Sequence, residues 1–259
     1  LSAGGPPKET CARPEAVPPA SLRGAPAVKS SKPSPFTSPA PATLVPWHDV
    51  RLVWAHRMSH EDVASDIIAW TSASPPAELS DGSAPFSLTD SSRVIDAYLD
   101  GRPERGRVGR AFEGASTAWE ITCDYGAWRD LQRHRIVSAT TPRLGASLGF
   151  WRSPSLESFG VAAEFDDEVE RAGRLARSIA EEDPDAAQYA TPMAFRVRYR
   201  LVINLRELFH LVELRSARGG HESYRWIAQQ MGSTVCGLCP WLSPHLRVDR
   251  ERYDFARQA

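Results

Sequence analysis

Residues 195–215 read Phe-Arg-Val-Arg-Tyr-Arg-Leu-Val-Ile-Asn-Leu-Arg-Glu-Leu-Phe-His-Leu-Val-Glu-Leu-Arg, and this stretch decides the fold. Apolar residues occupy every second position from Phe195 to Ile203, and arginines stand between the first four of them at 196, 198 and 200, which is typical of a β-strand with one buried face. From Asn204 to Arg215 the pattern is that of a mostly apolar, buried helix, with Asn204 as its cap and Glu207 three positions later. A strand that leads directly into a buried helix indicates an α+β domain.

The same patterns predict further elements on both sides of this stretch. Helices are expected over 60–72, 90–99, 125–135, 157–182 and 221–231, and a short strand over 118–123. A basic, glycine-rich loop is expected over 101–111. The helix over 157–182 has the clearest periodicity, because spacings of three and four place these residues on one face: Ala162, Phe165, Val169, Ala172, Ala176 and Ile179.

Composition divides the chain of 259 residues into two parts. Residues 1–46 hold 11 of the 21 prolines and all three lysines, which predicts a disordered Pro/Ala/Ser-rich linker. Residues 47–259 are then one folded domain, long enough for a sizeable core. The formal net charge of -1 argues against a general nucleic-acid-binding protein. The chain does not begin with Met, and we expect it to be a piece of a longer protein.

Neither an apolar membrane span nor a secretory signal is present in the sequence, so we expect a cytoplasmic protein. The four cysteines fit a reducing compartment. Cys236 and Cys239 form a single CxxC pair, which without further ligands does not predict a metal site.

Two segments could carry chemistry. Arg133, His134 and Arg135, followed by Ser138, could attract an anion at the end of a predicted helix, or could be a solvated helix end that faces the helix dipole. On the helix from Asn204, a polar stripe of Arg206, His210 and Glu213 is followed by Arg215. A buried Arg needs an anionic partner, which is either a protein carboxylate such as Glu207 or Glu213, or a phosphorylated ligand.

Together these segments resemble the flavin-dependent thymidylate synthases. The signature of that family begins Arg-His-Arg-x-x-Ser, which is Arg133-His134-Arg135-Ile-Val-Ser138 here. Its Phe-Glu-His stretch corresponds to Phe112-Glu113-Gly114, and its Asn-x-Arg helix to Asn204-Leu-Arg206 with His210 and Leu214-Arg215. The blocks occur in the family's order over residues 107–231. The amino-acid sequence of these blocks is most similar to the second copy in a long subgroup of the family that has two tandem copies per chain.

The resemblance implies a curved, mainly antiparallel sheet flanked by helices. It also implies that dUMP, or a related uracil nucleotide, is methylated with FAD as cofactor, methylenetetrahydrofolate as carbon donor and NADPH as reductant. The family works as a homotetramer and needs no metal or nucleophilic cysteine, so we expect a homo-oligomer or pairing with another copy. The implied cofactor-binding residues are Glu113, Arg133, His134, Arg135, Asn204, Arg206 and His210. The implied substrate-binding residues are Arg133, Ser138, Arg143, Gln188 and Arg215, with Arg215 as the catalytic residue that holds and polarises the uracil ring.

The sequence also departs from the family pattern. The family signature continues with an Asn, a Ser and an Arg-Tyr pair, and this sequence has Thr140, Arg143, Gly145 and Ala146 at those positions. An Ala-Arg stretch of the family is Ala187-Gln188 here. The lost groups include contacts to the nucleotide phosphate, each worth about 1.5–3 kcal/mol. Three functions therefore stay open: an active methylase, a non-catalytic copy that supports a catalytic one, and a flavin-binding module with an altered nucleotide substrate.

Overall fold

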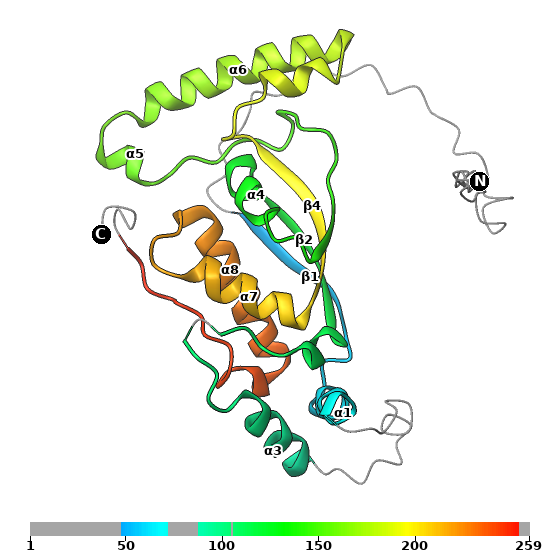
Figure 1. Ribbon diagram of the computed structural model, residues 1–259. Helices are drawn as coiled ribbons and strands as arrows, with labels where there is room; N and C mark the ends of the chain where they lie inside the picture. Colours follow the sequence, from blue (N-terminus) through cyan, green and yellow to red (C-terminus); the bar gives the residue numbers. More distant parts are fainter. Residues whose placement is uncertain (1–47, 72–87, 105, 254–259) are drawn as a thin grey trace, which may run out of the picture. The chain divides into compact units, whose positions relative to one another are not determined.

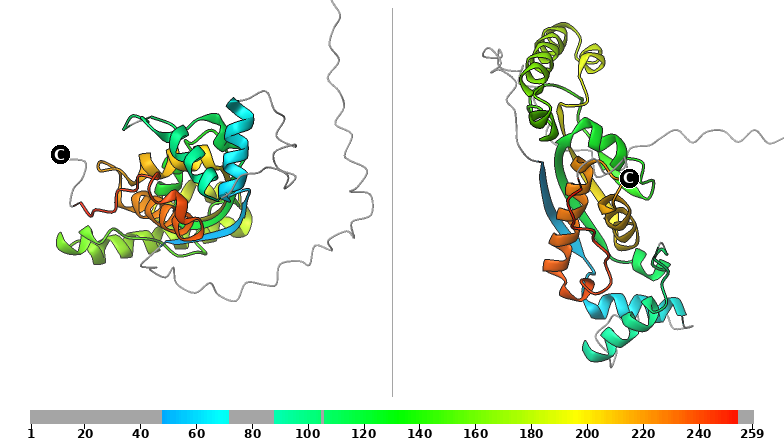
Figure 2. Two further views of the ribbon diagram at one scale, coloured as in Figure 1. Left: turned by 90° about the horizontal axis from the view of Figure 1, so that it is seen from below. Right: turned by 90° about the vertical axis from the view of Figure 1, so that its left-hand side faces the viewer.

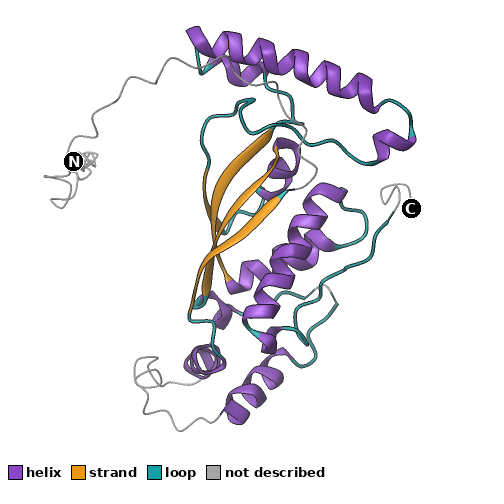
Figure 3. Ribbon diagram, turned by 180° about the vertical axis from the view of Figure 1, so that it is seen from behind, coloured by secondary structure: helices purple, strands orange, loops and turns teal. Residues whose placement is uncertain are grey.

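The computed structural model describes residues 48–71, 88–104 and 106–253, so the predicted linker over 1–46 lies outside the described residues (Figure 1). Four strands form one antiparallel sheet in the order β1 (Asp49–His56), β2 (Ser116–Asp124), β4 (Arg196–Asn204) and β3 (Val137–Thr140). Helices lie beside this sheet in Figure 3. The predicted α+β class with an antiparallel sheet and flanking helices is confirmed.

The central strands β2 and β4 lead into helices without a loop. Along β4 the apolar side chains of Val197, Tyr199, Leu201 and Ile203 are buried, as the alternation predicts. Asn204 ends β4 and caps α7 (Leu205–Ser216), since its Oδ1 accepts the backbone N–H of Glu207 at 2.8 Å. Asp124 ends β2 and caps α4 (Tyr125–Leu131) in the same way, through the N–H of Ala127 at 2.7 Å.

The main hydrophobic core lies between the sheet and the helices α7 and α8 (Glu222–Leu238). These two helices pack against each other, α7 contacts β4, and α8 contacts β1 and α4 (Figure 1). Large side chains of the sheet and of α7, such as Trp119, Leu201 and Phe209, are almost completely buried there. This packing holds α7 and α4 in fixed positions relative to the sheet.

The remaining helices are peripheral to this core. α1 (His60–Thr71) and α3 (Leu88–Leu99) pack against each other, and the short helix η2 (Arg110–Glu113) contacts both α1 and α7 (Figure 2). α6 (Ala162–Glu182) contacts η3 (Ala186–Ala190), and its Val169 joins Phe150 and Phe195 in a second, smaller hydrophobic cluster. None of the helices in the described ranges is long and apolar enough to cross a membrane.

Several predicted boundaries were wrong. The helix expected over 125–135 ends at Leu131, so residues 133–135 lie in a turn. The helix expected over 157–182 is divided into α5 (Ser155–Ser158) and α6, because Gly160 adopts φ 70° between them. The last predicted helix, over 221–231, continues to Leu238 as α8, and η4 (Pro240–Leu242) follows it. The strands β1 and β3 were not predicted.

Candidate functional site

The register of the sheet brings the turn after α4 over α7. Asp124, which begins α4, lies opposite Arg196 at the start of β4, whereas Val137 lies opposite Ile203 at its end. Between Asp124 and Val137 the chain therefore passes from the start of β4 to its end, and the segment 132–136 is the last part of this path. This segment brings His134 to α7, where the residue is only 4% exposed. The adjacent Arg133 and Arg135 are exposed.

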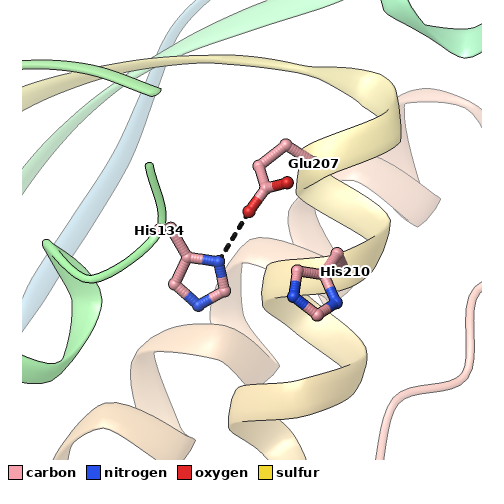
Figure 4. A group of neighbouring side chains, drawn as sticks. All are labelled: His134, Glu207 and His210. Carbon is pink, nitrogen blue, oxygen red and sulfur yellow. Dashed lines mark hydrogen bonds and ion pairs between the residues drawn. The ribbon is translucent and has the colours of Figure 1, made fainter. Parts of the chain in front are cut away.

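His134 is bonded to α7 through both of its ring nitrogens. Its Nδ1 lies 2.8 Å from Oε1 of Glu207 in the first turn of α7 (Figure 4). Its Nε2 accepts a hydrogen bond from Nε of Arg215, two turns further along the helix, at 3.1 Å. Glu207 is 5% exposed, so this carboxylate is buried and its partner is a protein side chain.

Arg215 has two further contacts besides His134. Its Nη2 donates to the backbone oxygen of Asp130 at 2.7 Å, and its guanidinium lies over the ring of Tyr224, 5.3 Å from the centroid. These contacts come from α4, the turn after it and α8. The half-buried guanidinium is therefore held from three directions.

His210 lies beside His134, with ring centroids 5.4 Å apart. Nη2 of Arg107 lies 3.3 Å from Nε2 of His210, and a guanidinium can only donate, so this nitrogen is the acceptor. Burial lowers the pKa of His210, and the positive charge of Arg107 lowers it further. Both effects favour a neutral ring.

The loop before η2 follows α7 in the reverse direction. Arg102 forms a two-pronged ion pair with Glu213, at 2.8 and 2.9 Å, and Arg107 reaches His210 one turn earlier. Arg206 donates to the backbone oxygen of Val108 at 3.0 Å and to Oε1 of Glu113 at 3.2 Å. The polar stripe expected on α7 is thus confirmed as a stripe, and its residues pair with the basic loop predicted over 101–111.

A metal ion is one chemical possibility for this cluster. His134, Glu207 and His210 offer three ligand atoms within 4.8 Å of one another, and two His with one carboxylate form a common metal-binding set. However, each ring has one nitrogen against a guanidinium, from Arg215 and Arg107, so two positive charges face a single carboxylate. Such a balance suits an anionic ligand better than a cation.

Three of the predicted substrate-binding residues, Ser138, Arg143 and Gln188, make other contacts. Arg143 makes an exposed ion pair with Asp185 at 2.8 Å, and Oε1 of Gln188 accepts the backbone N–H of Leu144 at 3.1 Å. Ser138 is exposed on β3. Within residues 48–71, 88–104 and 106–253, no hydrogen bond or ion pair joins Ser138, Arg143 or Gln188 to His134 or Arg215.

A buried polar cluster near the start of β1 was missed by the sequence interpretation. Ser223 Oγ donates to Oδ2 of Asp124 and lies 2.8 Å from Nε2 of His48. Burial, with a smaller contribution from Arg196, lowers the pKa of His48 to about 4. Only Asp124 had a signal in the sequence, as a capping residue before a helix.

Comparisons with known proteins agree with this architecture. The chain is 40% identical over 166 residues to a UPF0159 protein of Chlamydia muridarum, covering 63% of this chain and 31% of the relative. It is 34% identical over 176 residues to a UPF0159 protein of Thermoplasma acidophilum, covering 66% of this chain and 35% of the relative. The chain thus spans about a third of the length of the curated relatives that it matches.

A solved structure has a similar fold. The UMP/dUMP methylase PolB of Streptomyces cacaoi, in a crystal structure bound with 5-Br dUMP, superposes with a TM-score of 0.63 at 17% sequence identity. The likeness covers 80% of this chain and 99% of that one. The profile of the thymidylate synthase complementing proteins matches residues 49–241, which include the segments bearing His134, His210 and Arg215. The resemblance noted in the sequence is therefore confirmed, and the chain belongs to the thymidylate synthase complementing protein family.

Proposed function

We propose that this domain methylates dUMP, or a related uracil nucleotide, with FAD as cofactor, methylenetetrahydrofolate as carbon donor and NADPH as reductant. One observation carries the proposal. His134 of the Arg-His-Arg segment contacts His210 and Arg215 of α7 in one site. It also bonds to Glu207 of the same helix, which is 73 residues away in the sequence. Family membership and the fold of a nucleotide methylase support it.

The residues of this site fit an anionic flavin dinucleotide. Arg133 and Arg135 are exposed beside the buried His134, and the ion pair of Arg133 with Asp130 is loose at 3.5 Å. Their guanidiniums are therefore available for phosphate oxygens, which they can bind in pairs of hydrogen bonds. Asn204, Arg206, His210 and Glu113 would line the isoalloxazine ring. Bound FAD would supply the hydride chemistry between NADPH and the folate carbon.

Arg215 would hold and polarise the uracil ring. Its contacts with His134, Asp130 and Tyr224 already fix the guanidinium, so little reorganisation is needed when charge develops on the substrate. A fixed cation lowers the barrier more than a mobile one.

The nucleotide phosphate would be bound by Ser138, Arg143 and Gln188. The ion pair between Arg143 and Asp185 is exposed on both sides, at 63% and 68%, and such pairs are worth about 0–1 kcal/mol. The free-energy cost is therefore small when Arg143 leaves Asp185 and binds a phosphate group instead. Arg143 could in this way replace the charge of the arginine that the family pattern places at Gly145.

Association with another copy belongs to the same proposal. Large apolar side chains are exposed on α6 and near η3, among them Leu175 at 57%, Tyr189 at 96% and Met193 at 56%. A homo-oligomer, or a second copy within a longer chain, would cover them. The relatives' greater length also favours a second candidate function, in which this domain is a non-catalytic copy that supports a catalytic one.

An absorption spectrum and one variant test the proposal. The purified protein should show flavin absorption and should oxidise NADPH only when dUMP and methylenetetrahydrofolate are present. Arg215→Ala should reduce this turnover at least about 100-fold, the usual loss for one electrostatic group in a transition-state site. Arg93→Ala, on the exposed surface of α3, is the matched control and should keep turnover. A protein that takes up no flavin would instead support the non-catalytic copy.

A further inference from the structure

The contact between Arg215 and His134 shows which ring nitrogen of His134 carries the proton. A guanidinium carries only donors, so Nε2 of His134, 3.1 Å from Nε of Arg215, must present its lone pair. The ring proton is then on Nδ1. Nδ1 faces Oε1 of Glu207 at 2.8 Å, and that carboxylate can accept it. The three side chains thus form a directed chain, in which Arg215 donates to His134 and His134 donates to Glu207.

Glu207 is placed for this purpose by the start of α7. In a capping box, the residue three positions after the cap turns its carboxylate back to the backbone N–H of the cap. Here only half of that motif forms, because the side chain of Asn204 accepts the N–H of Glu207 while the Glu207 carboxylate bonds to His134. The carboxylate is 5% exposed, and a buried carboxylate requires such a partner.

The position of the proton on the His134 ring decides whether Arg215 can donate a hydrogen bond to His134. The hydrogen bond at one ring nitrogen of a histidine determines which nitrogen carries the proton. Without an acceptor at Nδ1 the proton can move to Nε2, where it would face the N–H of Arg215. The guanidinium would then lose this contact but keep those with Asp130 and Tyr224, so that it would remain bound but turned.

We propose that Glu207 is a positioning residue that holds His134 in its Nδ1–H form and, through it, sets the orientation of Arg215. The part of this inference that concerns turnover rests on the proposed function. The part that concerns the proton does not, because it follows from the three side chains alone. Glu207 would touch neither substrate nor cofactor.

The first measurement is the tautomer of His134 in the full chain. Long-range ¹H–¹⁵N spectra of histidine-labelled protein, assigned with His134→Phe, should show the proton on Nδ1. Glu207→Gln keeps an acceptor oxygen and should preserve this form, whereas Glu207→Ala should move the proton to Nε2 or mix the two forms. A wild-type proton on Nε2 would overturn the proposal, and so would an unchanged tautomer in Glu207→Ala. The wild-type spectrum decides even where Glu207→Ala does not fold.

The second measurement is steady-state turnover with dUMP. Glu207→Ala should lower kcat about tenfold, the equivalent of one hydrogen bond to a charged group, with a smaller change in KM, and Glu207→Gln should recover most of the loss. Glu61→Gln, on the exposed surface of α1, is the matched control. Equal losses in the Ala and Gln variants would contradict positioning. If the wild type has no turnover, the proposed function fails, and the tautomer alone decides the role of Glu207.

Discussion

Replacing Glu213 by alanine tests whether the loop before η2 is held to α7 by its ion pair with Arg102. The two side chains are 16% and 7% exposed and meet through two hydrogen bonds. Removing one partner of a buried pair costs about 3–5 kcal/mol, because a charge is left without compensation. Arg102 would keep the backbone oxygens of Gly106 at 3.2 Å and His245 at 2.7 Å, so we expect the lower end, about 3 kcal/mol.

The assay is urea unfolding of the full chain, followed by fluorescence of its eight tryptophans. Glu168→Ala breaks an exposed pair with Arg171 on α6 and should cost less than about 0.5 kcal/mol. The double variant Arg102→Met with Glu213→Leu should lose less free energy of unfolding than Arg102→Met and Glu213→Leu lose in sum when each is made alone. The expected difference is about 1.5–3 kcal/mol. A Glu213→Ala loss no larger than that of Glu168→Ala, or strict additivity, would refute the reasoning.

Two further predictions concern other parts of the domain. Burial lowers the pKa of His48 from 6.5 to about 4, so between these pH values the unfolded chain binds a proton that the folded chain does not. The free energy of unfolding should fall by up to about 3 kcal/mol as pH drops from 6.5 to 4, with a weaker fall in His48→Gln, measured by urea unfolding at each pH. A Cβ at Gly173 would lie 2.6 Å from the ring of Phe195, so Gly173→Ala should lower Tm despite its better helix propensity. Gly145→Ala has open space and should leave Tm unchanged in the same thermal scan; equal shifts would contradict the packing argument.

The sequence predicts those parts of the fold whose signal is local. The alternation over 195–203 and the cap at Asn204 lie within one stretch, and β4 and α7 follow within one residue of their predicted bounds. In β1 the alternation lasts only from Asp49 to Leu52, because the strand has a bulge between Leu52 and Trp54. β3 has only four residues, which is too short for a pattern to be distinguished from a loop.

The site could be predicted only in part, for a similar reason. Resemblance pointed to His134, His210 and Arg215, and the structure brings these three together. The partner of Glu207 could not be predicted, because its spacing from Asn204 equally fits a capping box. Only the strand register, with Val137 opposite Ile203, places His134 within reach of this carboxylate.

The direct junction between β4 and α7 limits which changes in chain length the domain can accept. Asn204 is both the last residue of the strand and the cap of the helix, so no loop residue can absorb an insertion. One extra residue before it would turn α7 by about 100°, since each helical residue advances by that angle. Arg206, His210 and Arg215 would then lose their hydrogen bonds at the same time, although none of the three residues would be substituted. Variation in length at this junction is therefore far more damaging than substitution within it.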